Sequence, residues 1–322
     1  MIESPTTNAY IAEPTSPELE KHLLSQDSPT ENKASTMTDA DILLVKNTPI
    51  TSKLRTAIRH IKVVAGPFAR FRGLHIAFIY HALYSVSMSL LSHLAGPAPV
   101  FFRPLLAIII SIALCRIHMT WTHHVIAMPS SKSWWQRIPP RKLGRKLIGP
   151  TLVWAFARQV SVYVPGALFV NVFEILKHPE VYGGNPQTMQ KVALIELFAI
   201  FFIFCATVVL IVVPAEVSLK RVEASMLPEE EDTIVPFDKS FAGRFKSEAL
   251  GGPGAVSLID AWRTFGKEAR IRLIKLYAKV FAVQFAVAIL FTMVLVGEVK
   301  LITGGDFQRL VEVARKSVKG EL

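Results

Sequence analysis

The stretch that most constrains the fold of this chain is Lys191–Pro214, KVALIELFAIFFIFCATVVLIVVP. Between Val192 and Val213 it carries one charged side chain, Glu196, and contains neither glycine nor proline. An α-helix rises about 1.5 Å per residue, so a helix of this length covers the hydrocarbon core of a bilayer, which is about 30 Å thick. A buried helix of a soluble protein rarely needs so long an apolar stretch. The sequence therefore predicts a membrane-spanning helix here.

Four further apolar stretches predict an all-α integral membrane protein with five spans. Hydrophobic residues form 51% of the 322 positions and charged residues only 19%, below the roughly 25% of typical soluble domains. The predicted membrane domain covers residues 74–298, with spans at 74–94, 104–127, 149–176, 192–213 and 274–296.

The remaining segments are polar and differ in kind. Residues 1–41 are rich in Ser, Thr, Pro, Asn and Glu, and this composition predicts a disordered tail. Leu258, Trp262 and Phe265 share one helical face and indicate an amphipathic surface helix. That surface helix is predicted at 257–272, after a polar loop at 215–256, and a polar C-terminal tail is predicted at 299–322.

Residues 53–72 combine apolar and basic side chains at helical spacing. Leu54, Ile58, Ile61 and Val64 recur three or four positions apart, and the basic residues lie elsewhere around the turn. Such a basic amphipathic helix is suited to lie on a bilayer and bind anionic lipid headgroups. The alternative is an ordinary helix beside the first span with no specific lipid role.

The net charge of +11 predicts how the spans are oriented. In membrane proteins Lys and Arg concentrate in loops on the cytosolic or matrix side. We therefore expect the basic helix and the segments 130–148 and 215–272 on that side, with the turns near Pro97 and Gly183 on the other. The basic residues flank spans and form no known nucleic-acid motif, so nucleic acid is not an expected partner.

The cysteines and histidines bear on chemistry. Cys115 and Cys205 fall inside apolar stretches, which indicates neither a disulfide framework nor a zinc site. His118, His123 and His124 look like one histidine box of the di-iron membrane enzymes, whose metals need several neutral imidazoles. No second box exists in the sequence. A di-iron enzyme is thus the remote alternative to histidines of an interfacial aromatic belt, and we expect no cofactor and no enzymatic activity.

A threefold layout runs through the chain. A basic amphipathic segment followed by an apolar span occurs at 53–94, 134–176 and 257–296. The spans that precede the second and third copies end at Pro129 and Pro214. In this layout the chain resembles the mitochondrial carrier family, whose members are solute transporters built of three two-helix repeats.

Two motifs carry the carrier resemblance. Gly149–Lys177 looks like an even-numbered carrier helix, because Phe173-Glu174-Ile175-Leu176-Lys177 follows the aromatic–acid–x–x–base pattern. Pro214–Arg221 is similar to the proline–x–acid–x–x–base signature, with one extra residue before the base. The resemblance implies a pseudo-threefold bundle, solute transport and the mitochondrial inner membrane; otherwise the endoplasmic reticulum or another endomembrane is expected. The chain departs from the family at Pro129–Lys132, which lacks the acid, and in having five spans instead of six.

The whole chain also resembles a fungal family of multi-spanning proteins that is loosely labelled "ubiquitin carrier protein". This resemblance is clearest in Arg221–Phe241 and in the segment SLIDAWRTFGKEARIRLIKLY, which begins at Ser257. A ubiquitin-conjugating activity would need an accessible thiolate. Because Cys115 and Cys205 lie in apolar spans, the residues do not support that activity.

Polar residues inside spans are candidate substrate-binding residues because a buried ionisable group there costs several kcal/mol. Repeat-to-repeat register would bring Arg158, Gln159, His81 and Gln284 to one level of a central cavity. An Arg–Gln pair at that level would suit a small anionic solute. The alternative is a structural ion pair between Arg158 and Glu196 of the neighbouring span.

Two charged pairs at span ends have a similar double interpretation. By the carrier resemblance, Glu174 with Lys177 and Glu216 with Lys220 would be gate ion pairs. As plain chemistry they are interfacial charges, which is normal at the ends of spans. Two functions therefore remain open: a carrier-like transporter of a small anion, and a non-transporting structural or adaptor protein that binds anionic lipid.

Overall fold

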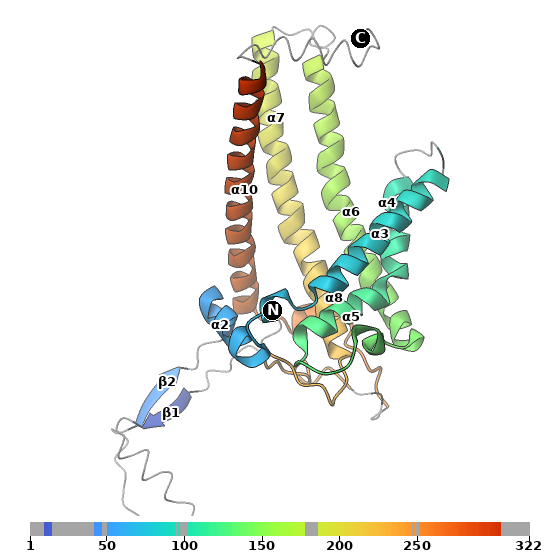
Figure 1. Ribbon diagram of the computed structural model, residues 1–322, viewed down its shortest axis with the longest axis vertical. Helices are drawn as coiled ribbons and strands as arrows, with labels where there is room; N and C mark the ends of the chain where they lie inside the picture. The colour runs from blue at the N-terminus through green and yellow to red at the C-terminus, as the bar shows by residue number, and fades with distance from the viewer. Residues whose placement is uncertain are drawn as a thin grey trace, which may run out of the picture. The chain divides into compact units, whose positions relative to one another are not determined.

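The computed structural model describes residues 10–14, 42–46, 50–94, 96, 102–177, 186–246, 248 and 251–303. The chain divides into two compact units, Met1–Gly266 and Lys267–Leu322. The second unit contributes one long helix, α10 (Lys267–Thr303). The elements of the first unit are β1 (Tyr10–Pro14), β2 (Ile42–Lys46), η2 (Ile50–Ser52), α2 (Leu54–Ala65), η3 (Ala69–Phe71), α3 (Leu74–Leu94), α4 (Phe102–Ala113), α5 (Cys115–Ile126), η4 (Trp134–Arg137), α6 (Arg141–Lys177), α7 (Pro186–Thr207), η5 (Val208–Val212), α8 (Val213–Ser225) and α9 (Leu258–Arg263) (Figure 1).

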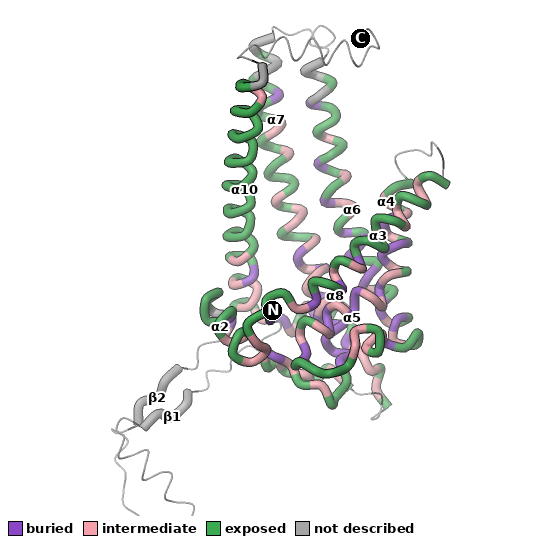
Figure 2. Tube along the Cα trace, in the orientation of Figure 1, coloured by how far each residue is buried: buried purple, intermediate pink, exposed green. Residues whose placement is uncertain are grey.

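The described helices confirm the predicted all-α membrane fold. Four helical segments are long and apolar enough to cross a bilayer: Ala69–Leu94, Arg141–Val172, Lys191–Ser225 and Lys267–Leu301. The pair formed by α4 and α5 makes a fifth if it is counted as one span. Along α7 the large apolar side chains face outward, as in Phe202, which is 68% exposed. Figure 2 shows the same exposure over most of α6, α7 and α10.

The predicted second span, 104–127, is not a straight helix. It consists of α4 and α5, which meet at Leu114 with a bend of 58°. No glycine or proline lies at the bend. The last two turns of α4 are apolar except for Ser111, which bonds its own helix, whereas α5 buries polar side chains that need partners elsewhere in the protein. The bend directs those side chains onto α8.

The predicted fourth span continues well beyond residue 213. α7, the π-helical turn η5 and α8 form one continuous rod, so the prediction of a loop at 215–256 was wrong as far as Ser225. Pro214 lies in the first turn of α8, where its missing amide hydrogen costs little. The π turn precedes this proline and lengthens the hydrogen-bond spacing just before it.

Other boundaries also shift. The predicted surface helix 257–272 is split, since α9 ends at Arg263 and α10 begins at Lys267. The basic segment 130–148 is partly helical, because α6 starts at Arg141. β1, which lies in the predicted N-terminal tail, pairs antiparallel with β2, which lies just after that tail, in the register Tyr10↔Lys46. The rest of residues 1–41, the tips near Pro97 and Gly183, and residues 304–322 lie outside the described residues.

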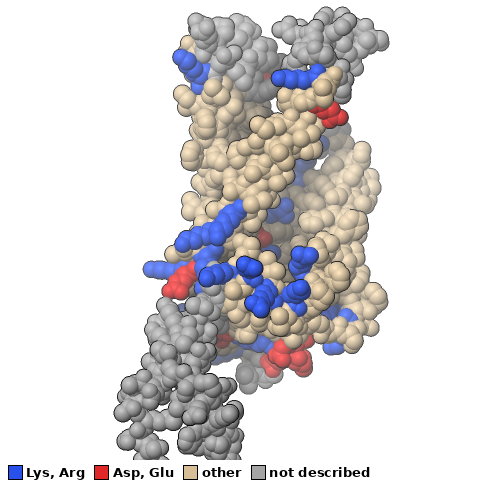
Figure 3. Space-filling view, turned by 60° about the vertical axis from the view of Figure 1, so that its left-hand side comes forward, with Lys and Arg blue, Asp and Glu red and all other residues tan. Residues whose placement is uncertain are grey.

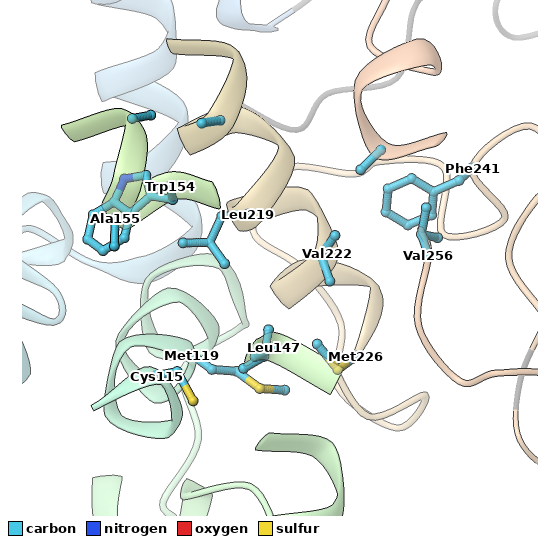
Figure 4. Close-up of a cluster of buried hydrophobic side chains, with 13 residues drawn as sticks. Cys115, Met119, Leu147, Trp154, Ala155, Leu219, Val222, Met226, Phe241 and Val256 are labelled. Carbon is cyan, nitrogen blue, oxygen red and sulfur yellow. The ribbon is translucent and has the colours of Figure 1, made fainter. Parts of the chain in front are cut away.

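A buried core lies where α5, α6, α8 and α9 meet the loop after α8; we call this region the packed end. Leu219 and Val222 of α8 are each 1% exposed. Figure 4 shows Leu219 directed toward Trp154 and Ala155, with Phe241 and Val256 on the other side of α8. Each fully buried leucine or valine contributes roughly 1.5–3 kcal/mol. The core comprises Cys115, Met119, Leu147, Trp154, Ala155, Ala157, Ala215, Leu219, Val222, Met226, Phe241, Val256 and Ala261.

Candidate functional site

A buried carboxyl group on α8 binds the polar face of α5. Glu223 is 0% exposed. Nδ1 of His118 donates to its Oε1 at 2.6 Å, and Oγ1 of Thr122 donates to its Oε2 at 2.5 Å. Nε2 of His123 donates to the backbone carbonyl of Glu223 at 2.7 Å. Positions 118 and 122 lie one above the other on the helix, and position 123 lies next to them around the turn. Because an unpaired buried carboxyl costs several kcal/mol, this network fixes α5 on α8.

Three aromatic rings pack against the ring of His118. Its ring centroid lies 5.2 Å from Trp154, 5.5 Å from Tyr80 and 5.7 Å from Trp121. These contacts bring together α3, α5 and α6. We call Tyr80, His118, Trp121 and Trp154 the aromatic cluster. The His118 contacts with Tyr80 and Trp121 are edge-to-face, and aromatic pairs at such distances contribute about 0.5–1.5 kcal/mol each.

A buried arginine joins α8 to α9. Nε of Arg221 donates to the carbonyl of Ala261 at 2.8 Å, and its Nη2 donates to Oγ1 of Thr264 at 2.8 Å. The guanidinium also stacks on two rings, at 4.9 Å from the centroid of Phe241 and 5.5 Å from that of Phe265. Arg221 is therefore held from several directions and serves as an anchor of the packed end.

The loop that presents Phe241 is held by an aspartate. Phe241 and Ala242 have φ of +50° and +56°, which is unusual for residues with a Cβ. The Asp238 carboxylate accepts the Ser240 hydroxyl at 2.6 Å and the amides of Ser240 and Ala242 at 2.8 Å each. These hydrogen bonds, that of the hydroxyl foremost, hold the pKa of Asp238 below its usual value. They stabilise the left-handed conformation that buries Phe241 beneath Arg221.

The first unit places two predicted substrate residues beside the aromatic cluster. Arg158 is exposed on α6, with its guanidinium 5.0 Å from the ring centroid of Trp154. The His81 ring lies 6.1 Å from that of Trp121. Gln159 is half-buried next to Arg158. Gln284 is exposed on α10 in the second unit, and its meeting with the other three stays a prediction.

The predicted ion pairs have different outcomes. Glu216 and Lys220 lie 3.3 Å apart, one turn apart on α8. Among the described residues no ion pair joins Arg158 to Glu196 of α7. Arg158 stacks on Trp154 of its own helix instead. Glu174 is exposed near the end of α6, and its pairing with Lys177 lies outside the described side chains.

The histidines do not form a metal box in this geometry. Within the described part of the chain no three His, Cys, Asp or Glu side chains lie close enough to hold one ion. His118 and His123 each direct a ring N–H at Glu223. His124 packs edge-on against His75 at 5.2 Å. The remote di-iron interpretation therefore does not fit these residues.

Sequence reasoning missed Arg72, Arg221 and Glu223. The sequence predicts a polar loop at Arg221 and Glu223 because Pro214 indicates the end of a span. The available signal was the pattern RVEASML, in which two charged residues alternate with small and apolar ones as in a buried helix. The chain was compared with protein-family models, curated proteins and solved structures, and no match was found in any of the three. Both family resemblances therefore stay predictions.

Proposed function

We propose that this multi-pass membrane protein binds anionic lipid headgroups through α2 and the turn that joins it to the first span. The supporting observation is the position and pattern of α2. This helix ends at Ala65, and the first candidate span begins at Ala69. A connection of three residues keeps α2 close to the membrane–water interface.

One side of α2 packs against the protein and another is open. Ala57 is buried, whereas Leu54 and Ile58 are exposed apolar residues. At about 100° per residue, the basic side chains of Arg55, Arg59 and Lys62 lie directly beside this exposed apolar strip. Phe68 and Phe71, which are also exposed, follow in the turn.

The pattern matches an interfacial helix that inserts apolar side chains between headgroups while its cations meet lipid phosphates. Each Lys or Arg near an anionic surface contributes about 1 kcal/mol, and salt weakens the attraction. Figure 3 shows several Lys and Arg side chains close together in the lower half of the face that it draws. By the distribution of positive charge, the end that carries α2 faces the cytosol or matrix.

A probe at Ile58 tests the proposal. Cys115 and Cys205 are replaced by alanine, and bimane is attached to a new cysteine in Ile58→Cys. The bimane emission is measured in nanodiscs of phosphatidylcholine with and without phosphatidylserine. We expect a blue-shifted emission that phosphatidylserine strengthens and salt weakens. Bimane at Val63→Cys, on another side of α2, is the matched control. Replacement of Arg55, Arg59 and Lys62 by glutamine should abolish the response to phosphatidylserine. Identical spectra at both sites in both lipids would refute the proposal.

Arg158 supports transport of a small anion as a second candidate function. It is exposed within the span of α6 and has no acidic partner among the described residues. A cation at this depth is expensive unless it meets water, another helix or an anion. The test measures uptake of labelled phosphate or malate into proteoliposomes. Uptake by the wild type that is lost in Arg158→Gln but kept in the control Arg103→Gln would favour transport. Absence of uptake by the wild type would exclude it for these solutes.

A further inference from the structure

A cavity of about 410 Å³ lies beside α2, on the side of Ala57 and Ile61. Its walls come from α2, the turn before α3, α5, α8 and the loop after α8. Gly73 allows this arrangement: its φ is +75°, and a Cβ there would lie 2.8 Å from Val125 and 2.9 Å from Trp121. The loop is fixed across α5 by the hydrogen bond from the Ile234 amide to the Ile126 carbonyl, 2.9 Å long.

The lining of the cavity has two kinds of surface. Most of it is apolar, with side chains such as Val125 and Val235. Among the described residues that line the cavity, three are cations and none is acidic. A volume of several hundred Å³ with apolar walls and few polar groups is typical of small-ligand sites. The cationic members are Arg70, Arg72 and Lys220.

Arg72 has an unused hydrogen-bond donor. Its Nη2 donates to the carbonyl of His124 at 3.0 Å. Its Nη1 is buried and has no hydrogen-bond partner among the described residues. A buried donor without an acceptor costs about 1–3 kcal/mol. An anion that enters the cavity could supply the missing acceptor.

The other two cations add charge without closing the site. Arg70 is exposed and stacks on Phe71 at 5.0 Å. Lys220 has Nζ 3.3 Å from Glu216 and 5.9 Å from the ring centroid of Trp121. Glu216 pairs with Lys220, so Arg70 and Arg72 carry the positive charge of the lining that this acid does not offset.

We infer that this cavity binds one anionic amphiphile. Its phosphate group lies at Arg72, Arg70 and Lys220. Its apolar chain packs against Val125, Ile126 and Ile234. A cationic ligand would be repelled, and a neutral one would leave the positive charges of Arg70 and Arg72 without a counter-charge. A free phosphate ion would leave the apolar walls in water. The inference extends the proposed function. It depends on that function only in one respect, the position of the cavity beside the membrane surface.

Binding of hexyl phosphate tests the inference, because this probe is soluble and carries both features. Titration calorimetry uses the full chain in phosphatidylcholine nanodiscs, with empty nanodiscs as blank. We expect saturable binding of one hexyl phosphate per chain. Inorganic phosphate and hexanol should each bind at least about tenfold more weakly, since each lacks one half of the recognition.

Variants separate the site from the general surface charge. Arg72→Gln and Lys220→Gln should each weaken hexyl phosphate binding about tenfold, and Ala57→Phe should abolish it by filling the cavity. Arg59→Gln, which removes a cation of α2 outside the cavity, should leave binding unchanged. Circular dichroism melting identifies any variant that fails to fold. Arg72→Gln also removes the hydrogen bond to the His124 carbonyl, so Lys220→Gln and Ala57→Phe test the site without changing that bond.

Several results would overturn the inference. Equal affinity for inorganic phosphate would reduce the site to a free-anion site, and equal affinity for hexanol would reduce it to an apolar pocket. The same loss in Arg59→Gln as in Lys220→Gln would mean surface attraction only. If hexyl phosphate does not bind while bimane at Ile58 still responds to phosphatidylserine, the inference fails and the proposed function stands.

Discussion

The two halves of the rod formed by α7 and α8 lie in opposite environments. On α7 and η5 the apolar side chains are exposed, as in Leu210, which is 72% exposed. On α8 most side chains are buried, including two charged ones, Arg221 and Glu223. The backbone is helical throughout, so helix formation does not distinguish the halves. The difference is the surroundings: the first half exposes apolar side chains, as a helix in lipid does, and other parts of the protein surround the second.

The length of the rod agrees with this division. The 35 residues from Lys191 to Ser225 form a helix of about 52 Å, whereas a hydrocarbon core is about 30 Å thick. The remainder therefore extends beyond the membrane and forms the centre of the packed end. Charged groups on α8 stabilise the protein there because each has partners within the protein.

The largest effect is expected at Glu223. Glu223→Ala removes the acceptor of His118 and Thr122 and should destabilise the protein by about 4 kcal/mol, as when one partner of a buried ionic contact is deleted. Thermal unfolding of the purified protein in a nonionic detergent measures this loss. Glu229→Ala, at an exposed position of the following loop, is the control and should have no effect. Equal melting temperatures for both variants would show that the network does not hold α5 to α8.

Leucines on the two halves sharpen the comparison. Leu219→Ala leaves a cavity in the packed end and should cost about 3 kcal/mol. Leu210→Ala removes a side chain that faces lipid and should change stability by less than about 0.5 kcal/mol. Denaturation of both variants in the same detergent gives the difference. A comparable loss at Leu210 would place that residue in a protein contact.

The two stacked arginines give a smaller contrast. Arg221→Ala removes two hydrogen bonds and two ring contacts and should cost about 2 kcal/mol. Arg221→Lys should not restore stability, because one ammonium group cannot keep both bonds and stack on the rings. Arg158→Ala, which loses only the contact with Trp154, should melt close to the wild type. If Arg158→Ala destabilised the protein more than Arg221→Ala, the Arg158 side chain would have to make a further contact that stabilises the fold.

The smallest effect is expected from acidification of the Phe241 loop. The pKa of Asp238 is lower in the folded protein than in the unfolded chain, so its contribution is present above about pH 4, the usual aspartate value. That contribution is lost as the pH falls further, through the lowered folded-state pKa. Amide hydrogen exchange at Ser240 and Ala242, corrected for the intrinsic rate, should speed up in that window. In Asp238→Asn exchange should be faster at neutral pH and change less with pH.

The spans could be predicted because their cause is local. A stretch such as Lys191–Pro214 must avoid water whatever surrounds it, and its length alone indicates a bilayer. The basic amphipathic pattern of residues 53–72 likewise appears in the sequence, and the structure places α2 at Leu54–Ala65 within it.

The packed end could not be predicted because its causes are distant in the chain. The bend at Leu114 has no local signal; it follows from partners on α8, about a hundred residues later. Pro214 suggested the end of a helix, yet a proline in the first turn of a helix is tolerated. The cavity at Arg72 depends on five segments that meet only in the fold.

The most direct test of the account asks on which side of the membrane the two ends of the rod lie. Cys115 and Cys205 are first replaced by alanine. One new cysteine is then introduced in each of two variants, at Thr188 near the start of α7 or at Glu230 just after α8, and each variant is placed in sealed vesicles. Both positions are exposed. A membrane-impermeant maleimide should label one position from outside and the other only after the vesicles are opened. Labelling of both positions from the same side would contradict a rod that crosses the bilayer.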